Sequence, residues 1–227
     1  MFTKVFVLSV SLIYNFNIMK SQIIPKVVGG GPANISQYPH SAFILMIKHT
    51  GGFVCGSSIL NQRILLTAAH CIDSPYQESH VYAGHSDRTL GDKYRIAAVT
   101  THEHYNVHTV SNDIGLVLLK TPIRFGSLVQ RAKRIVIAKK KPTEGMAKMA
   151  GWGAVKYIYL VPYHCTRLCF FFGDSGSALV FKNHIQIGLV SYKIRNKSKS
   201  VIIYTDVPYF YNWIVENTKS LVCNKTE

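Results

Sequence analysis

Short apolar runs alternate with polar turn sequences along most of the chain. The runs are rich in β-branched and aromatic residues, and clusters of Gly, Pro, Asn, Asp and Ser separate them, a pattern typical of β-strands joined by turns. We expect strands at residues 42–47, 56–60, 63–67, 94–99, 114–119, 135–138, 155–161, 177–181, 185–192 and 201–205.

Helical spacing is clear only near the C-terminus. From about residue 208 onward, side chains fall on one helical face at Phe210, Trp213, Ile214 and Asn217. Many short strands followed by one terminal helix predict an all-β protein, built as a sandwich or as barrels. With 227 residues the chain is long enough for one large all-β domain or two small ones.

The N-terminus has a different pattern. A short basic start precedes an almost entirely apolar stretch over residues 5–13, which ends at Asn15 and Asn17. This predicts a secretory signal peptide over residues 1–21 and a secreted, extracellular protein. The alternative is a buried edge strand, but no turn sequence precedes the stretch. No later apolar run reaches the roughly 18 residues of a membrane span.

Composition agrees with a folded, exported protein. Apolar residues make up 48% of the chain and charged residues 16%, which argues against disorder. Export would place the five cysteines in an oxidising compartment, where disulfides are expected, and the odd number leaves at least one without an intrachain partner. Glycosylation sequons at Asn34, Asn196 and Asn224 agree with export.

The chain is strongly basic, with a net charge of +15. Part of this charge lies at Arg131, Lys133, Arg134 and residues 139–141. A basic surface favours anionic partners such as sulfated glycans or anionic membrane surfaces, and a solvated loop is an equally good interpretation. No nucleic-acid-binding motif is present, so no nucleic-acid partner is expected.

Three segments carry residues suited to nucleophilic catalysis. His70 follows an apolar strand, Asp113 precedes a strongly apolar strand, and Ser175 lies in a glycine-flanked turn. A serine hydroxyl is a poor nucleophile at its ordinary pKa, so it needs a base within hydrogen-bond reach. Histidine suits that role, and a carboxylate fixes its tautomer and stabilises the imidazolium.

In this order, the three segments resemble the chymotrypsin/trypsin-like serine proteases. The resemblance extends from Lys26 to about Asn217 and includes the segments 27–30, 151–153 and 209–214. It implies two six-stranded antiparallel β-barrels with a C-terminal helix, in a monomeric peptidase domain over residues 27–227. His70, Asp113 and Ser175 would form the catalytic triad in the cleft between the barrels.

The resemblance also implies a zymogen. An activating protease would cut after Lys26, at the end of a short propeptide over residues 22–26. The new α-amino group of Val27 would then pair with the carboxylate of Asp174, because a buried carboxylate needs a cationic partner.

Further roles follow from the same resemblance. The backbone N–H groups of Gly173 and Ser175 would form the oxyanion hole. Cys55 and Cys71 would form a disulfide, and Ser191 would donate a hydrogen bond to the triad aspartate.

The region between Gly153 and Gly173 is shorter than the family pattern. Within it, Cys165 and Cys169 resemble the two ends of a disulfide loop. The positions matching the specificity pocket are Cys169, Ser191, Lys193 and Ile202. None of them is the acid that a pocket for Lys or Arg needs, so trypsin specificity is not expected.

Two functions follow from these residues. The first is a secreted serine endopeptidase that hydrolyses protein or peptide substrates through an acyl-enzyme, and the intact triad favours it. The alternative is a non-catalytic homologue that acts by binding in a proteolytic cascade, or an incomplete gene model. His102, His104 and His108 suggest a metal site as a rival, but no Cys or acid spacing supports one. We therefore expect no metal and no cofactor.

Overall fold

The computed structural model describes residues 33–48, 51–74, 76, 78–87, 90–126, 134–153, 173–193 and 202–223. Within these ranges the chain is all-β with one C-terminal α-helix, as the sequence predicts. In chain order the elements are the 3-10 helix η1 (Ile35–Gln37), β1 (Ser41–Lys48), β2 (Gly51–Ile59), β3 (Ile64–Thr67), the 3-10 helix η2 (Ala69–Cys71), β4 (Glu78–Ala83), β5 (Asp92–Thr101), β6 (Gly115–Leu119), β7 (Val136–Ile137), β8 (Ala147–Met149), β9 (Ala178–Phe181), β10 (Ile185–Lys193), β11 (Ile202–Asp206) and α2 (Tyr211–Cys223).

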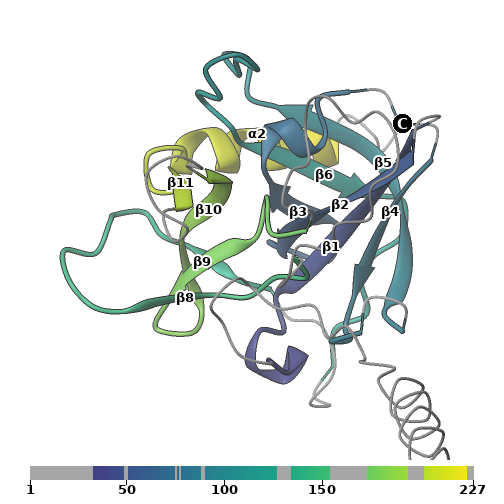
Figure 1. Cartoon of the computed structure of the whole chain (residues 1–227), viewed down its shortest axis with the longest axis horizontal. Helices are drawn as coiled ribbons and strands as arrows, with labels where there is room; N and C mark the ends of the chain where they lie inside the picture. Colours follow the sequence, from purple (N-terminus) through teal and green to yellow (C-terminus); the bar gives the residue numbers. More distant parts are fainter. Residues whose placement is uncertain are drawn as a thin grey trace, which may run out of the picture.

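The first six strands close into an antiparallel barrel. Its strand order is β1-β2-β3-β6-β5-β4, and β4 returns to pair with β1 (Figure 1). β3 and β6 are buried along their whole length. Their apolar side chains belong to the main apolar core, and α2 packs against β6. Ile214 of α2, and Phe210 just before the helix, belong to the same core. Burial on both faces explains why residues 114–119 form an unbroken apolar run.

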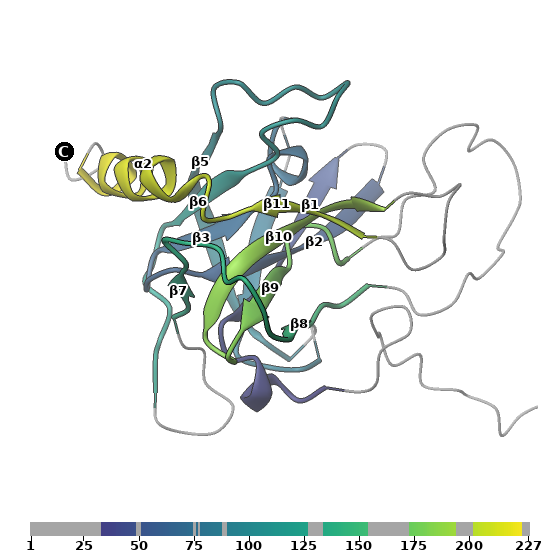
Figure 2. The ribbon, with the colours of Figure 1, turned by 90° about the vertical axis from the view of Figure 1, so that its left-hand side faces the viewer.

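A second sheet follows in the C-terminal half. Its strand order is β11-β10-β9-β8, and the short β7 pairs with β10 in parallel. Figure 2 shows this sheet beside the barrel, with α2 at one end of the molecule. The strand expected at residues 155–161 lies outside the described residues, so the described part of the second unit is a five-stranded sheet.

The structure adds β4 and β8, which the sequence pattern did not reveal. β4 buries His80 beside Val81, so a buried polar residue interrupts the expected alternation. β8 is three residues long and includes an exposed lysine. The terminal helix begins at Tyr211, after a turn in which the N–H of Phe210 donates to the carbonyl of Val207. No helix in the described ranges is long and apolar enough to cross a bilayer.

Candidate active site

The histidine is held where β3 leaves the barrel. His70 lies in η2, directly after the fully buried β3, and its side chain is 29% exposed. The Cys55–Cys71 disulfide joins η2 to β2. Beside it, the hydroxyl of Thr67 donates to the carbonyl of Gly56 at 2.8 Å. These contacts fix the backbone of the histidine against two barrel strands.

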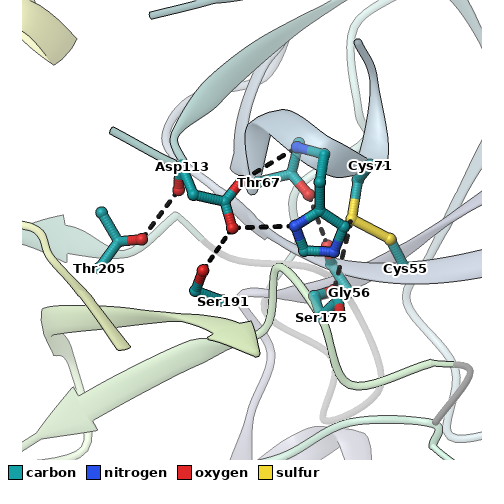
Figure 3. A network of polar contacts seen from close by, with 9 residues as sticks. Cys55, Gly56, Thr67, Cys71, Asp113, Ser175, Ser191 and Thr205 are labelled. Carbon is teal, nitrogen blue, oxygen red and sulfur yellow. Dashed lines mark hydrogen bonds and ion pairs between the residues drawn. A yellow bond between two sulfur atoms is a disulfide. The ribbon is translucent and has the colours of Figure 1, made fainter. Parts of the chain in front are cut away.

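Asp113 lies just before β6 and is 1% exposed. The chain turns into this position through Asn112, whose φ of 51° is in the left-handed region that Asn tolerates better than most residues. The second sheet supplies two further contacts. Ser191 Oγ donates to Asp113 Oδ2 at 2.5 Å, and Thr205 Oγ1 donates to the Asp113 carbonyl at 2.8 Å (Figure 3). Asp113 is therefore fixed by both halves of the molecule.

His70 and Asp113 contact each other at two points. The backbone N–H of His70 donates to Asp113 Oδ1 at 3.0 Å, and His70 Nδ1 lies 2.9 Å from Oδ2. Burial alone would raise the pKa of Asp113, but the hydrogen bonds from His70 and Ser191 outweigh it and hold that pKa below its ordinary value. An ionised Asp113 accepts the Nδ1 proton, which leaves Nε2 as the basic nitrogen.

Ser175 lies in a turn that only glycine-flanked sequence can form. Gly173 and Gly176 have φ of 123° and 83°, in the region that side chains rarely adopt. The Ser175 carbonyl accepts the N–H of Gly56 at 2.6 Å, which ties the turn to β2.

The turn also places Ser175 near the imidazole. Cys71 Sγ lies 3.7 Å from His70 Nε2 and 3.9 Å from the Ser175 carbonyl, so Ser175 lies on the Nε2 side of the ring (Figure 3). Among the described contacts, no hydrogen bond joins Ser175 Oγ to His70 Nε2.

The backbone donors of the turn differ in whether the described residues supply an acceptor. The N–H of Gly176 donates to the Val190 carbonyl, and the N–H of Ser177 donates to the Asp174 carbonyl. By contrast, the N–H groups of Gly173 and Ser175 have no acceptor within the part of the chain that the structure describes. Two free N–H groups beside a serine are suited to binding an oxyanion.

The Gly151-Trp152-Gly153 segment makes room for the acid that precedes Ser175. A Cβ at Gly153 would lie 2.4 Å from the Asp174 carboxylate, and one at Gly151 would lie 2.3 Å from it. The N–H of Gly153 donates to Asp174 Oδ1 at 2.9 Å. Between the glycines, Trp152 Nε1 donates to the Ser86 carbonyl, which fixes the segment to the first barrel.

Two site residues were not identified by sequence reasoning. Thr205 was assigned only to a strand, although its hydroxyl holds the Asp113 carbonyl. Ser177 is 2% exposed, and among the described residues its hydroxyl has no hydrogen-bond partner.

The remaining predicted site residues are only partly described. Lys26, Val27, Cys165 and Cys169 lie outside the described residues. The backbone of Lys193 pairs with the half-buried Ile202 across β10 and β11. The predicted pocket role of these residues stays a prediction.

The clustered histidines serve packing contacts here. The His102 ring lies 5.2 Å from the ring of Trp213 and 5.8 Å from that of His104. Within the described residues, the one group with metal-ligand proximity is Cys55, His70 and Cys71, and its two sulfurs are joined in the disulfide. Disulfide sulfurs are not the thiolates that bind metals.

Comparison with known sequences identifies relatives of the chain. A trypsin of Simulium vittatum is 30% identical over 140 residues, covering 60% of this chain and 57% of that protein. Trypsin beta of Drosophila erecta is 33% identical, and 51% of its length is covered. The chain thus spans little more than half of these relatives. Trypsin epsilon of Drosophila erecta is 26% identical and is covered to 90%.

Comparison with solved structures supports the fold. HL collagenase matches with a TM-score of 0.70 at 19% identity, over 85% of this chain and 99% of that one. A scabies mite inactivated protease paralogue, S-D1, matches with a TM-score of 0.68 at 17% identity, over 88% of this chain and 99% of that one. The trypsin family model matches residues 27–214. The resemblance found in the sequence is therefore confirmed, and the chain belongs to the trypsin family of serine proteases.

Proposed function

We propose that the chain is a serine endopeptidase that uses Ser175 as nucleophile, His70 as general base and Asp113 as the residue that orients the base. The observation that carries this proposal is the double contact between His70 and the buried Asp113, which keeps Nδ1 protonated and Nε2 basic. Such a pair next to a serine in a tight turn is the arrangement that activates a hydroxyl.

The chemistry is acyl transfer in two halves. Ser175 Oγ attacks the scissile carbonyl carbon as His70 Nε2 takes the hydroxyl proton. The resulting oxyanion accepts hydrogen bonds from the N–H groups of Gly173 and Ser175. The C–N bond then breaks, the amine leaves with the proton from His70, and an acyl-enzyme remains. Water repeats the steps: His70 takes its proton, and the serine ester is cleaved to a carboxylic acid and free Ser175.

The missing Ser175–His70 hydrogen bond is compatible with this role. Catalytic hydrogen bonds are often long in ligand-free sites and shorten when substrate binds. A small rotation about the Ser175 side chain changes the position of Oγ without moving the turn, because the Ser175 carbonyl stays fixed by Gly56.

Activation after Lys26 is part of the proposal. The amino group of Val27 would pair with Asp174, which sits beside the oxyanion turn and already accepts the N–H of Gly153. This pairing would stabilise the turn in its catalytic shape. Secretion fits the Cys55–Cys71 disulfide, since disulfides persist in oxidising compartments. The substrates would be proteins or peptides, with specificity unlike that of trypsin.

A fluorophosphonate probe, which reacts with activated serines, tests this function. The chain is labelled before and after cleavage at Lys26, with Ser175→Ala as the control. We expect labelling only after cleavage, and none in the variant. A folded and correctly cleaved chain without labelling would contradict the proposal and favour a non-catalytic homologue.

A further inference from the structure

The run of lysines noted in the sequence is partly neutralised in the fold. Lys141 Nζ lies 3.4 Å from Asp206 Oδ2, and Lys139 Nζ lies 5.9 Å from the centre of the Tyr211 ring. Two of the three charges are thus already in contact with an acid or an aromatic face. The run is a weaker anion-binding candidate than its sequence suggests.

Another group of cations gathers where three barrel strands meet. β6 lies between β3 and β5. At the end of β6, the N–H of Leu119 donates to the Arg63 carbonyl at 2.8 Å. The N–H of the next residue, Lys120, donates to the Arg95 carbonyl at 2.9 Å. Lys120 therefore lies directly opposite Arg95 in the register. Arg63 lies opposite Leu119, and its guanidinium reaches the Lys120 carbonyl. The side chains of Arg63, Lys120 and Arg95 are all exposed, and we call these three residues the basic row.

No described acid neutralises the basic row. The ion pairs of lysine or arginine in the described part of the chain are Lys93–Glu78 and Lys141–Asp206. The basic row therefore carries a positive charge that faces solvent and that no described acid offsets.

The guanidinium of Arg63 is also held in place. Its Nε and Nη2 donate to the Leu119 carbonyl at 3.2 and 3.1 Å, and Nη2 donates to the Lys120 carbonyl at 3.1 Å. Nη1 makes none of these bonds, and Arg63 is exposed, so the Nη1 donors remain for a ligand. A pre-ordered guanidinium loses less side-chain entropy when it binds an anion.

We propose that the basic row binds a sulfated polysaccharide. Arginine donors match the geometry of tetrahedral oxyanions, and neighbouring cations that no described acid offsets favour a polyanion. A protein partner would need an apolar anchor. The row contains none, because the exposed large apolar residues in the described part of the chain are Leu90, Val99, Val107, Val136, Met146, Tyr192, Tyr209 and Val222.

Heparin chromatography tests the proposal. The full chain carrying Ser175→Ala, which prevents self-cleavage, is compared with the added pair Arg95→Gln and Lys120→Gln. Among the described contacts, neither the Arg95 nor the Lys120 side chain makes a hydrogen bond. The matched control is Lys148→Gln with Lys182→Gln, which removes the same charge from an exposed position in β8 and from the exposed turn after β9.

We expect the row variant to elute from heparin at clearly lower salt, with affinity reduced about tenfold or more, and the control to elute near the parent. On a plain sulfonate cation exchanger both variants should shift alike, because both lose two charges. Equal shifts on heparin would overturn the proposal. So would loss of binding to phosphatidylserine vesicles without loss of heparin binding, which would identify a membrane surface as the occupant. Neither readout depends on catalysis.

Discussion

Asp113 fixes His70 through the ring and through the backbone at the same time. One oxygen of the Asp113 carboxylate accepts the backbone N–H of His70 at 3.0 Å, and the other lies 2.9 Å from Nδ1. The two residues are 43 positions apart in the sequence. Because Oδ2 also accepts the Ser191 hydroxyl, the second sheet shares in holding the histidine of the first barrel. A change at Asp113 is therefore expected to alter both the position and the protonation of His70.

The substitution Asp113→Asn should abolish most of the hydrolytic activity without unfolding the chain. The amide is nearly the same size, but it cannot stabilise the imidazolium, and its NH₂ group favours the wrong tautomer of His70. We expect kcat to fall by about 10⁴-fold. An ester-hydrolysis assay of the cleaved protein measures this, with circular dichroism to show that the fold persists. Full activity in a folded variant would refute the assigned role.

The substitution Ser191→Ala perturbs the same carboxylate more mildly. It removes one hydrogen bond from the Asp113 carboxylate, so the pKa of Asp113 should rise relative to the parent. An acid whose pKa is lowered by folding stabilises the protein above its ordinary pKa and loses that contribution as the pH falls through the folded value. The variant should therefore be less stable than the parent near neutral pH, and this difference should narrow as the pH falls below the ordinary pKa of Asp113, because less of its stability depends on the ionised carboxylate. Unfolding in urea from neutral to acidic pH measures the difference, and a difference that stays constant over this range would contradict the role given to Ser191.

Gly153→Ala should disable the site through Asp174. The added Cβ would lie 2.4 Å from the Asp174 carboxylate, so the acid and the turn that bears Ser175 must move. The control is Gly52→Ala, whose Cβ would approach no atom closer than 3.4 Å. We expect fluorophosphonate labelling to be lost in the first variant and kept in the second. Equal labelling of both would show that the turn tolerates displacement of Asp174.

The candidate catalytic residues could be selected from the sequence because each lies beside a distinctive local pattern. Gly173 and Gly176 mark a tight turn before Ser175, and a continuous apolar run marks the buried strand after Asp113. These signals depend on neighbours in sequence. The triad assignment itself came from the family resemblance, and the structure supplies the His70–Asp113 contact.

Other features depend on contacts between distant segments. The hydroxyl of Thr205 reaches Asp113 across 92 positions, and no local pattern distinguishes it from any other strand threonine. The basic row is likewise formed by the order of β3, β6 and β5, whereas the sequence drew attention to contiguous lysines. β4 was missed because His80 is buried in it, which breaks the apolar pattern on which strand prediction relies.

Ser177→Ala should stabilise the protein. Within the described part of the chain the buried Ser177 hydroxyl has no hydrogen-bond partner, so its removal relieves a desolvation cost of about 1–2 kcal/mol. Ser57 provides the matched control, because it is equally buried and its hydroxyl donates to the Ala42 carbonyl at 3.1 Å. Ser57→Ala should destabilise by about 1 kcal/mol. Urea unfolding of both variants measures the two changes in the free energy of unfolding, which should have opposite signs. A loss of stability in Ser177→Ala would show that the Ser177 hydroxyl has a hydrogen-bond partner.

His40 should make stability depend on pH in the mildly acidic range. It is 3% exposed, and burial lowers its pKa from 6.5 to about 4. The folded state keeps His40 neutral while the unfolded state takes up a proton below pH 6.5, so stability is complete above that value and falls as the pH drops toward 4. The loss between about pH 7 and pH 4 should approach about 3 kcal/mol. Burial also lowers the pKa of His80 and His102, so the parent protein alone cannot isolate this contribution.

The His40→Leu variant isolates the contribution of His40 to the pH dependence of stability. Leucine is close in volume and cannot take up a proton, so the free energy of unfolding of the variant should fall less steeply over the same range. Relative to the parent, the variant should gain stability progressively as the pH decreases, with the difference levelling off near the folded pKa of about 4. Urea unfolding of both proteins across this range measures the difference. A difference that stays constant from neutral pH to pH 4 would mean that His40 takes up its proton as readily in the folded state as in the unfolded state.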